Sequence, residues 1–338
     1  MASVLITGGA GYIGSVLTAH LLGAGHNVRV LDCLLFGDSS LRAIASHNAF
    51  EFVAGDIRDG ACVRRVVEDV DVVVHLAAIV GDPACRSVPD LAREVNGDGA
   101  GLILEAALES RVGRFVFAST CSNYGRMADP VNYVTEESEL RPVSLYAELK
   151  VDFEKRLLAS DRKGFVPIVL RFATAFGVSP RPRFDLVINE FTRDLFERRR
   201  LQVFGENFWR PYCHIADISE AVRQAIEADK QKVRGQAFNV GHTAENYRKK
   251  DVVAMILKHL PDREDYVSYV VKEEDPRDYR VSFEKIKRTF GFEPKVTVED
   301  GIAQIITALE SGTIANSTDR RYRNDDPDIY NVLRKVRL

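Results

Sequence analysis

The chain has 338 residues, 46% of them hydrophobic, which is enough to bury a large core in one or two closely joined domains. Its formal net charge of -3 excludes a general attraction to nucleic acid or to an anionic membrane. We expect no membrane span and no signal segment, because no apolar stretch reaches the ~20 residues that a spanning helix needs. The five cysteines lack metal-ligand spacing, so we expect reduced thiols in a cytoplasmic protein and no bound metal.

Short β-branched runs alternate with amphipathic stretches over the first half of the chain. Most of these runs are apolar throughout, as in parallel strands that are covered on both faces. The segments between them are long enough for right-handed crossover helices. The pattern predicts an α/β fold with a Rossmann-type doubly wound parallel sheet, with strands at residues 3–7, 27–31, 50–54, 70–75, 114–119 and 166–172.

The first predicted strand runs into a glycine-rich turn that carries Gly8, Gly11 and Gly14, and a helix is predicted after it. Such a turn brings the backbone close to a pyrophosphate, which then binds at the helix N-terminus. Asp32 ends the second strand, where a carboxylate can accept both ribose hydroxyls of an adenosine and would repel a 2′-phosphate. Asp56 follows the third strand and can bond the adenine amine. These residues favour NAD over NADP.

A candidate catalytic set begins with Thr120, at the end of the fifth strand. Tyr146 and Lys150 are four residues apart, so on a helix they share one face. We expect the Lys150 ammonium, together with the positive nicotinamide of NAD⁺, to lower the pKa of the Tyr146 phenol. The phenolate would then remove a hydroxyl proton while a hydride leaves the adjacent carbon, with Thr120 bonded to the same substrate oxygen.

The pattern changes after Gly177, where proline and arginine cluster. Helices are predicted near residues 186–199 and 217–228, a short strand at 201–204, and a further buried strand at 236–240 that we expect to rejoin the main sheet. The second domain is then discontinuous. We expect an NAD-binding domain from residues 1–177, 215–245 and about 299–312, a nucleotide-sugar-binding domain from 178–214 and 246–298, and a charged C-terminal tail from 313–338.

Together these motifs resemble the extended short-chain dehydrogenase/reductase family, which includes nucleotide-sugar 4-epimerases and dehydratases. The resemblance runs from Gly8 to about Glu310. It implies that Thr120 and Tyr146 are catalytic and that Lys150 holds the nicotinamide ribose. It also implies a homodimer through a four-helix bundle, built from helices near residues 90–110 and 144–158. The further residues that it assigns to the cofactor site are Tyr12, Ile13, Ile57, Leu76, Ala77, Ala78, Asn96 and Phe172.

Two departures from the family pattern are informative. In the 4,6-dehydratases of the family the residues after the catalytic threonine supply an acid and a base, whereas Cys121 and Ser122 stand here. Neither side chain can drive the elimination of water at neutral pH, so we do not expect a 4,6-dehydratase. Thr174 stands where the galactose epimerases of the family carry asparagine, and we therefore expect different sugar contacts.

Substrate contacts are also implied by the resemblance. Arg210 matches the arginine that grips the nucleotide diphosphate, since a guanidinium fork fits two phosphate oxygens. A second phosphate contact is left open between Lys272, Arg277 and Arg280, and Arg277 is carried forward as the candidate.

Residues 78–83, 179–191 and 275–279 look closest to a bacterial subgroup that acts on capsule or lipopolysaccharide sugars and includes a GDP-heptose 4-dehydrogenase. That likeness implies that Arg183, Asp185 and Asn189 face the sugar nucleotide.

The sequence therefore predicts NAD-dependent oxidation at C4 of a nucleotide-linked sugar, by a 4-epimerase or a 4-dehydrogenase of cell-surface polysaccharide or deoxysugar biosynthesis. A 4-ketosugar reductase is the same site run backwards and stays open. A third hypothesis, from another class, is a catalytically silent NAD-sensing regulator. The intact set of Thr120, Tyr146 and Lys150 argues against it, because a sensor has no need of a tuned phenol.

Overall fold

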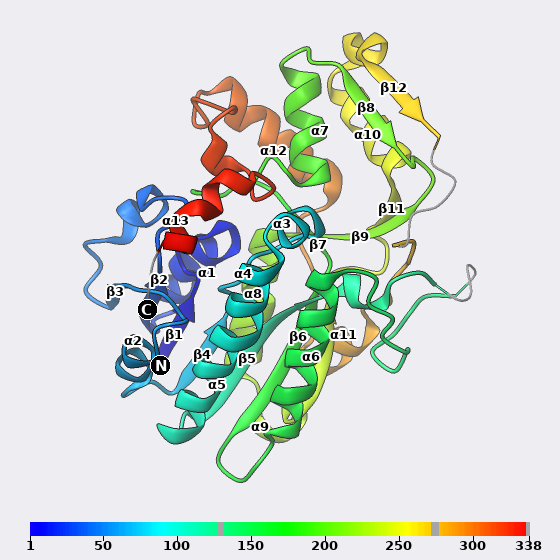
Figure 1. Cartoon of the computed structure of the whole chain (residues 1–338). Coiled ribbons are helices and arrows are strands. Elements are labelled where there is room, and N and C mark those ends of the chain that lie inside the picture. Colours follow the sequence, from blue (N-terminus) through cyan, green and yellow to red (C-terminus); the bar gives the residue numbers. More distant parts are fainter. Residues whose placement is uncertain (128–131, 272–276, 336–338) are drawn as a thin grey trace.

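The central sheet of the protein has seven parallel strands in the order β10-β6-β5-β4-β1-β2-β3 (Figure 1). The structure is a computed structural model, and it describes residues 1–127, 132–271 and 277–335. The order reverses direction between β1 and β4, which is the doubly wound topology that the sequence predicts. The strands are β1 (Ser3–Thr7), β2 (Asn27–Asp32), β3 (Phe50–Ala54), β4 (Val72–His75), β5 (Arg114–Thr120), β6 (Val166–Phe172) and β10 (Gln236–Val240).

The predicted strands agree with the observed ones to within two residues at each end, because most of them are largely apolar runs bounded by polar or turn residues. Every residue of β6 is buried, for example. The prediction that residues 236–240 rejoin the sheet is confirmed, since β10 pairs with β6 along its whole length.

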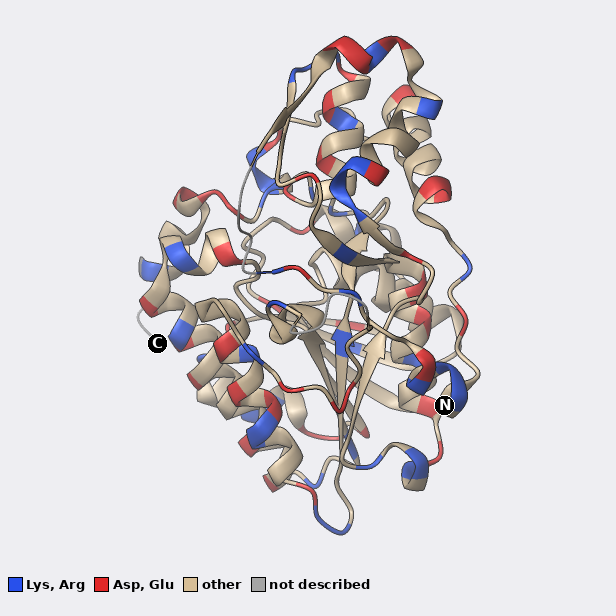
Figure 2. Ribbon diagram, turned by 90° about the vertical axis from the view of Figure 1, so that its right-hand side faces the viewer, with Lys and Arg blue, Asp and Glu red and all other residues tan. Residues whose placement is uncertain are grey.

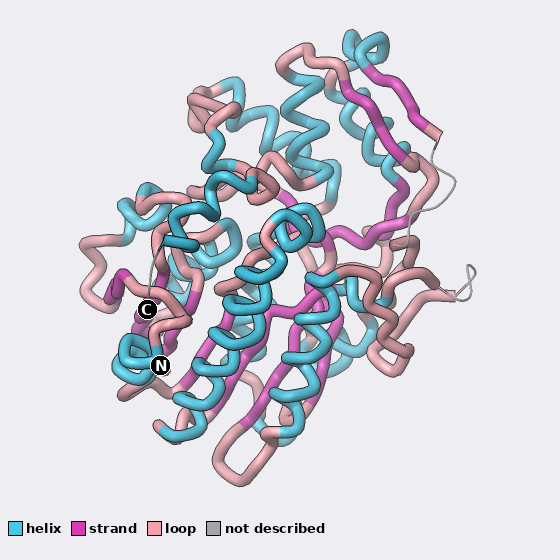
Figure 3. Tube along the Cα trace, in the orientation of Figure 1, coloured by secondary structure: helices cyan, strands magenta, loops and turns pink. Residues whose placement is uncertain are grey.

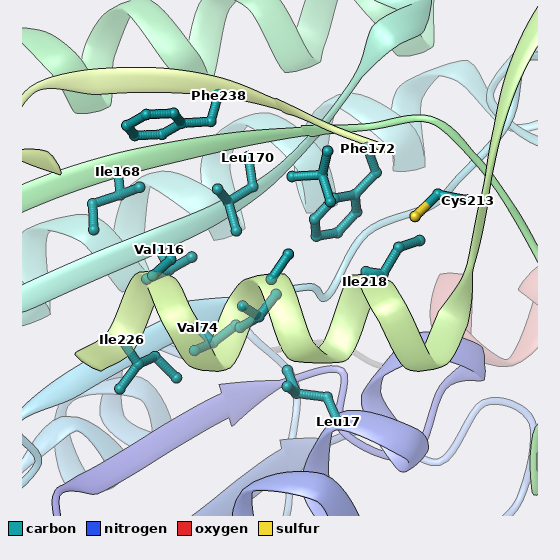
Figure 4. Close-up of a cluster of buried hydrophobic side chains, with 14 of the residues drawn as sticks. Leu17, Val74, Val116, Ile168, Leu170, Phe172, Cys213, Ile218, Ile226 and Phe238 are labelled. Carbon is teal, nitrogen blue, oxygen red and sulfur yellow. The ribbon is translucent and has the colours of Figure 1, made fainter. Parts of the chain in front are cut away.

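Helices cover both faces of the sheet. On one face lie α1 (Tyr12–Gly23), α8 (Ile215–Glu227) and α11 (Glu284–Phe290), and Figure 4 shows Ile218 and Ile226 of α8 packed among side chains of the strands. The other face is covered by α2 (Gly60–Val67), α3 (Asp82–Ser87), α4 (Pro89–Arg93), α5 (Ala100–Glu109) and α6 (Leu145–Ala159), while the short α9 (Lys230–Val233) lies beside β6.

A smaller layer of helices and short strands lies beyond the carboxyl ends of the main strands (Figures 1 and 3). Its own core is separate from the two cores that flank the sheet. Its elements are β7 (Thr174–Phe176), α7 (Val187–Phe196), β8 (Leu201–Phe204), β9 (Trp209–His214), β11 (Asn246–Arg248), α10 (Lys249–His259), β12 (Val267–Val270) and α12 (Val298–Glu310).

The packing of α12 differs from the expectation that residues 299–312 join the NAD-binding part. Its apolar face, which includes Ile302 and Ile305, is buried against α7 and α10 in the core of the smaller layer. An amphipathic pattern shows that a helix has one buried face, but it does not show which core receives that face.

The last part of the chain returns from the smaller layer to the main sheet, and it ends in α13 (Asn331–Lys335), near β2 in Figure 1. Backbone and side-chain contacts fix this course. The Tyr322 carbonyl accepts from the Phe184 amide at 2.7 Å, and the Leu333 carbonyl accepts from Arg58 at 3.1 Å. Tyr330 and Leu333 are buried in the same core as α2 and α5.

Charged residues of both signs are interspersed along the helices and loops, and most of the strand ribbon carries none (Figure 2). No helix in the described residues combines the length and the apolar character that crossing a membrane requires.

Candidate active site

One cleft runs along the carboxyl ends of β1 to β6, where a doubly wound sheet places its ligand. Its floor is the glycine-rich turn. Gly8 has φ +78°, and a Cβ on it would lie 2.8 Å from the Ala77 amide nitrogen. A Cβ on Gly14 would lie 2.2 Å from the Gly8 carbonyl oxygen. Both positions therefore require glycine, and the turn brings the backbone against the cleft.

The N-terminus of α1 opens into this cleft. Its cap residue, Gly11, has no side chain with which to satisfy the N–H groups of the first turn, and Tyr12, Ile13 and Gly14 line the cleft. Free N–H groups at the positive end of a helix attract phosphate. The predicted pyrophosphate position thus has the donors that it needs.

Asp32 lies at the end of β2 in the wall of the cleft. Its two carboxylate oxygens accept from the amides of Ala10 (3.0 Å) and Leu34 (2.8 Å). Burial raises the pKa of this carboxyl, and the two amide bonds act against that rise. The two backbone bonds thus fix the orientation of the Asp32 carboxylate in the cleft wall, and its contact with a ribose stays a prediction.

The third strand brings Asp56 and Ile57 to the same wall. Both oxygens of Asp56 are bonded to the guanidinium of Arg58, the closest contact being 2.8 Å. The predicted adenine contact of Asp56 would therefore share the carboxylate with Arg58, which also donates to the Leu333 carbonyl of the C-terminal segment.

Leu76, Ala77 and Ala78 follow β4 and line the centre of the cleft. Asn96 is hydrogen-bonded to this loop at Ile79. Its side-chain oxygen accepts from the Ile79 amide and its side-chain nitrogen donates to the Ile79 carbonyl, both at 2.8 Å. It lies in a π-helical turn, Glu94–Gly99, between α4 and α5. Such turns are frequent at functional sites. Asn96 thus shapes the cleft through Ile79.

Tyr146 and Lys150 line the cleft from α6, together with Phe172 at the end of β6. The helix begins after Ser144, whose hydroxyl accepts from the Ala147 amide as an N-cap. Lys150 is 4% exposed, and its ammonium donates to the Ala118 carbonyl at 2.8 Å. The Nζ atom lies 5.9 Å from the centre of the Tyr146 ring. The structure therefore brings the two predicted side chains together.

The pKa of Tyr146 is raised by burial and, less strongly, by the nearby Cys85, while Arg183 acts to lower it. Burial also lowers the pKa of Lys150 to about 8. In the protein without cofactor, the effect of burial on the pKa of Tyr146 thus outweighs the expected attraction between the Lys150 ammonium and the phenolate. A further positive charge beside the phenol, such as the nicotinamide of NAD⁺, is what the predicted deprotonation requires.

Thr120 ends β5, and its hydroxyl oxygen accepts from the Ser122 amide at 3.1 Å, which leaves its O–H able to donate. Cys121 is 1% exposed, its Sγ donates to the Arg171 carbonyl, and burial raises the pKa of its thiol. The Ser122 hydroxyl lies 3.3 Å from the hydroxyl of Tyr279. The pair after Thr120 therefore offers a buried thiol and a serine bonded to a phenol.

A buried ion pair holds α6 against β6. Glu154 bonds to Arg171 at 2.8 Å, and it also accepts from Ser119 and from Asn123. The side chains of Arg171 and Glu154 are 6% and 2% exposed. Because Ser119 precedes Thr120 on β5, this network fixes the strand, the threonine and the tyrosine helix relative to one another.

The predicted sugar-nucleotide residues lie in two groups. Arg183 lines the cleft and is paired with Asp185 at 2.6 Å. Asn189 is 2% exposed and its amide bonds to Gly177, to the Tyr12 hydroxyl and to the Arg183 carbonyl. Thr174 lies on β7, where its backbone pairs with β9.

The second group lies around Tyr279. Arg210 on β9 stands 5.5 Å from the ring of Tyr279, and its guanidinium donates to the Trp209 carbonyl. Arg277 forms an ion pair with Asp82 at 2.8 Å, and Asp82 also accepts from Ser144 at the start of α6. Arg280 lies over the rings of Trp209 and Tyr133. Lys272, the other candidate for a phosphate contact, is outside the described residues.

Several cleft residues were not predicted. Arg181 and Phe36 line it from loops, and Asn324, Tyr330 and Leu333 line it from the C-terminal segment. Arg181 belongs to the proline- and arginine-rich run that follows Gly177. That run was a signal from which Arg181 could have been predicted as a cleft residue. The charged, turn-rich tail carries no sequence pattern that indicates the cleft.

The chain is similar along most of its length to known enzymes that act on nucleotide sugars. A dTDP-glucose 4,6-dehydratase from Streptomyces niveus is 31% identical over 90% of this chain and 91% of its own length. A UDP-glucose 4-epimerase from Halalkalibacterium halodurans is 28% identical over 87% and 91% of the two chains. The solved structure of the dTDP-glucose 4,6-dehydratase DesIV from Streptomyces venezuelae, with NAD bound, has a TM-score of 0.83 at 26% identity and covers 92% of this chain and 98% of that one.

These similarities confirm the family, fold class and cofactor that the sequence predicts. Residues 4–241 match the NAD dependent epimerase/dehydratase family. The chain therefore belongs to the NAD-dependent epimerase/dehydratase family of extended short-chain dehydrogenases/reductases.

Proposed function

We propose that this enzyme oxidises C4 of a nucleotide-linked sugar with NAD, as a 4-epimerase or a 4-dehydrogenase. The observation that carries the proposal is the convergence of Tyr146 and Lys150 on the cleft formed by the glycine-rich turn and Asp32. The names of the relatives support the substrate class, because they act on UDP-glucose and dTDP-glucose.

In this proposal Tyr146 is the base that takes the proton of the C4 hydroxyl. Thr120 donates a hydrogen bond to the same oxygen, and buried Lys150 supplies a positive charge and a donor for the ribose of the cofactor. When bound, NAD accepts the hydride that leaves C4. The apolar lining of the cleft excludes water, which strengthens the electrostatic interactions between these groups.

The surroundings of Thr120 favour oxidation without loss of water. A 4,6-dehydratase needs an acid and a base beside the catalytic threonine. Cys121 has a thiol whose pKa is raised by burial and whose Sγ is bonded to the Arg171 carbonyl. Ser122 is bonded to Tyr279, another group that is not acidic at neutral pH. The site thus supports C4 oxidation and offers no carboxylate at these two positions.

For the diphosphate of the substrate we propose Arg210 and Arg277. They come from β9 and from the segment before α11, and Tyr279 lies two residues beyond Arg277 and under the Arg210 guanidinium. Asp82, paired with Arg277, links this region to the start of the Tyr146 helix. Arg183, Asp185 and Asn189 remain proposed sugar contacts.

The cofactor content of the purified protein separates the two reactions. We would denature it, count NAD⁺, NADH and NADP per chain, and incubate the native enzyme with UDP-, GDP-, dTDP- and CDP-hexoses. Close to one NAD(H) per chain after gel filtration, with a C4-inverted product, identifies a 4-epimerase. An exchangeable cofactor with NADH and a 4-keto product identifies a 4-dehydrogenase. Absence of nicotinamide binding, or a 4-keto-6-deoxy product, would contradict the proposal.

We also propose a homodimer in which α5 and α6 of each subunit form a four-helix bundle. The two helices lie side by side and are joined by an ion pair between Arg156 and Glu105 at 2.6 Å. Light scattering on the purified enzyme should give twice the mass of one chain. Replacing exposed side chains of α6 by glutamate should then shift the mass to that of a monomer, and a monomeric wild-type enzyme would contradict the dimer.

A further inference from the structure

Arg181 is a buried cation that has no ion-pair partner among the residues the structure describes. It lies in the loop between β7 and α7 and is 3% exposed. Its Nε and Nη2 atoms are buried, and within the described residues neither has a hydrogen-bond acceptor. A buried guanidinium with unmade hydrogen bonds is costly, and burial lowers the pKa of Arg181 to about 9. A bound anion would supply the hydrogen-bond acceptors and the negative charge that this guanidinium lacks.

The backbone of Arg181 is fixed to the phosphate end of the cleft. Its amide donates to the Ser179 hydroxyl, and that hydroxyl donates to the Tyr12 carbonyl at 2.8 Å. The Tyr12 hydroxyl in turn donates to the Gly177 carbonyl at 2.8 Å. The loop that carries Arg181 is thus attached to the first turn of α1, where the free N–H groups open into the cleft.

The side chain of Arg181 lies in the wall of the same cleft. Its guanidinium carbon is 3.7 Å from the centre of the Phe36 ring, which also lines the cleft and fixes the plane of the guanidinium. The nearby carboxylates have other partners: Asp185 is bonded to Arg183, and Asp32 to two backbone amides. They reduce the cost of the charge without bonding to it.

A second buried polar side chain in this cleft is also incomplete. Asn324, from the C-terminal segment, is 5% exposed and lines the cleft, and its side-chain oxygen has no partner in the part of the chain that is described. The segment is held in place there by the bond from the Tyr330 hydroxyl to the Asn324 carbonyl at 2.8 Å. Two unsatisfied polar groups therefore line one cleft. A dinucleotide can satisfy both, because its phosphate oxygens accept from Arg181 and a ribose hydroxyl can donate to the Asn324 side-chain oxygen.

We propose that Arg181 binds the pyrophosphate of NAD, with Asn324 beside it, as a second polar wall of the cofactor site in addition to the glycine-rich turn. A guanidinium fork offers two parallel N–H groups to two phosphate oxygens. The loop of Arg181 contacts the first turn of α1, and Asp32 marks the adenosine ribose, so the pyrophosphate is the anionic group that belongs between them. The inference concerns the cofactor and does not depend on which sugar reaction the enzyme performs.

The test compares ligands that do and do not carry the pyrophosphate. After removal of bound nucleotide, calorimetry on the whole chain would measure NAD⁺, ADP-ribose, ADP and adenosine. Arg181→Met keeps the contact with Phe36 and removes the charge. We expect it to weaken NAD⁺, ADP-ribose and ADP by about ten- to a hundredfold and to leave adenosine unchanged. Arg181→Lys keeps the charge without the fork and should lose less.

Thermal unfolding gives a second readout that a structural arginine would not reproduce. Because Arg181→Met removes an unpaired buried charge, the nucleotide-free variant should unfold at the same temperature as the wild type or higher, while NAD⁺ should stabilise it less. The matched control is Arg263→Met, which removes a buried arginine that donates to the Leu195 carbonyl. It should lower the unfolding temperature and keep the affinity for NAD⁺.

Four results would overturn the proposal. Equal weakening of adenosine, or a lower unfolding temperature of nucleotide-free Arg181→Met, would make Arg181 a structural residue. Unchanged NAD⁺ affinity with weaker UDP binding would assign it to the substrate. Tighter binding of NADP⁺ than NAD⁺ by the wild type, reversed in the variant, would assign it to a 2′-phosphate.

Discussion

The surroundings of Tyr146 disfavour ionisation of its phenol. Burial and Cys85 raise the pKa of Tyr146, and its neighbour Lys150 has a pKa lowered to about 8. The proposed base therefore depends on the positive charge of the bound cofactor, so proton removal is linked to NAD⁺ occupancy. Without NAD⁺ the Tyr146 phenol stays protonated, so it cannot take a proton from the substrate before the cofactor is bound.

Replacing Tyr146 by phenylalanine tests this role directly. The variant loses the proton acceptor and keeps the ring, so turnover should fall by about 10²–10⁴-fold, the usual contribution of general acid–base catalysis. NAD⁺ affinity, measured by calorimetry, should stay within a few-fold of wild type, because the phosphate and adenosine contacts are elsewhere in the cleft. Wild-type turnover in this variant would remove Tyr146 from the mechanism.

At the scale of elements, the active site depends on how α6 is attached to β5 and β6. The buried pair of Glu154 and Arg171 provides this attachment, with Ser119 and Asn123 completing the bonds of the carboxylate. Glu154→Ala leaves a buried guanidinium without its counter-charge, and the free energy of unfolding should fall by about 3–5 kcal/mol in urea denaturation. The double variant Glu154→Leu with Arg171→Met should recover most of that loss, since it leaves no buried charge. A single variant as stable as wild type would show that the pair contributes nothing.

The strand β4 carries a pH-dependent element of stability. His75 is 2% exposed, bonded to the Thr7 hydroxyl at 2.7 Å and stacked near Phe117, and burial lowers its pKa to about 3. The folded state thus excludes a proton that the unfolded chain binds below its ordinary pKa of 6.5. Stability should therefore fall as the pH drops from about 6.5 toward 3, by up to about 1.4 kcal/mol per pH unit.

Thermal unfolding of His75→Gln between pH 7 and 4 checks this sign. The glutamine does not titrate, so the variant should be less stable at pH 7 and show a flatter decline with acid. The exposed His47 provides a control, and His47→Gln should keep the wild-type slope. An unchanged slope in the His75 variant would assign the acid sensitivity to other groups.

At the scale of the whole molecule, the C-terminal segment joins the two parts of the enzyme across the cofactor cleft. It contacts the Arg181 loop through Tyr322, and through the Leu333 carbonyl it contacts Arg58, the partner of Asp56. Removing residues 316–338 deletes the buried side chains of Tyr330 and Leu333, each worth about 1.5–3 kcal/mol of burial. The truncated enzyme should unfold at a lower temperature and lose bound NAD(H) during gel filtration. Tyr330→Ala should show a smaller effect of the same sign, and full retention of NAD(H) in both would exclude this role.

The parallel sheet was predictable because most of its strands are largely apolar, and that property is local: β1, β3, β6 and β10 begin and end where the sequence predicts. The glycine turn, Asp32, Tyr146 and Lys150 were also predictable, because each follows a strand or shares a helix face. The partners of α12 and of the C-terminal segment were not, since they depend on contacts between distant parts of the chain. For the same reason no local pattern predicts that Arg181 is buried with two guanidinium nitrogens that have no acceptor among the described residues. The structure shows where the predicted site residues lie, and the roles assigned to them stay predictions, for Thr120, Tyr146, Lys150 and the cofactor residues as well as for Arg183, Asp185, Asn189, Arg210 and Arg277.

A deuterium atom placed at C4 of the nucleotide sugar shows directly whether the enzyme oxidises this carbon. NMR of the products would locate the label after incubation with the enzyme. C4 oxidation followed by return to the opposite face predicts deuterium at C4 of the epimer, and C4 oxidation with release predicts deuterium on the nicotinamide of NADH. Deuterium at C6 would show that water is lost by a 4,6-dehydratase, and deuterium left at C4 with unchanged configuration in a converted product would show that the enzyme is neither a 4-epimerase nor a 4-dehydrogenase. Either of these last two results would contradict the account.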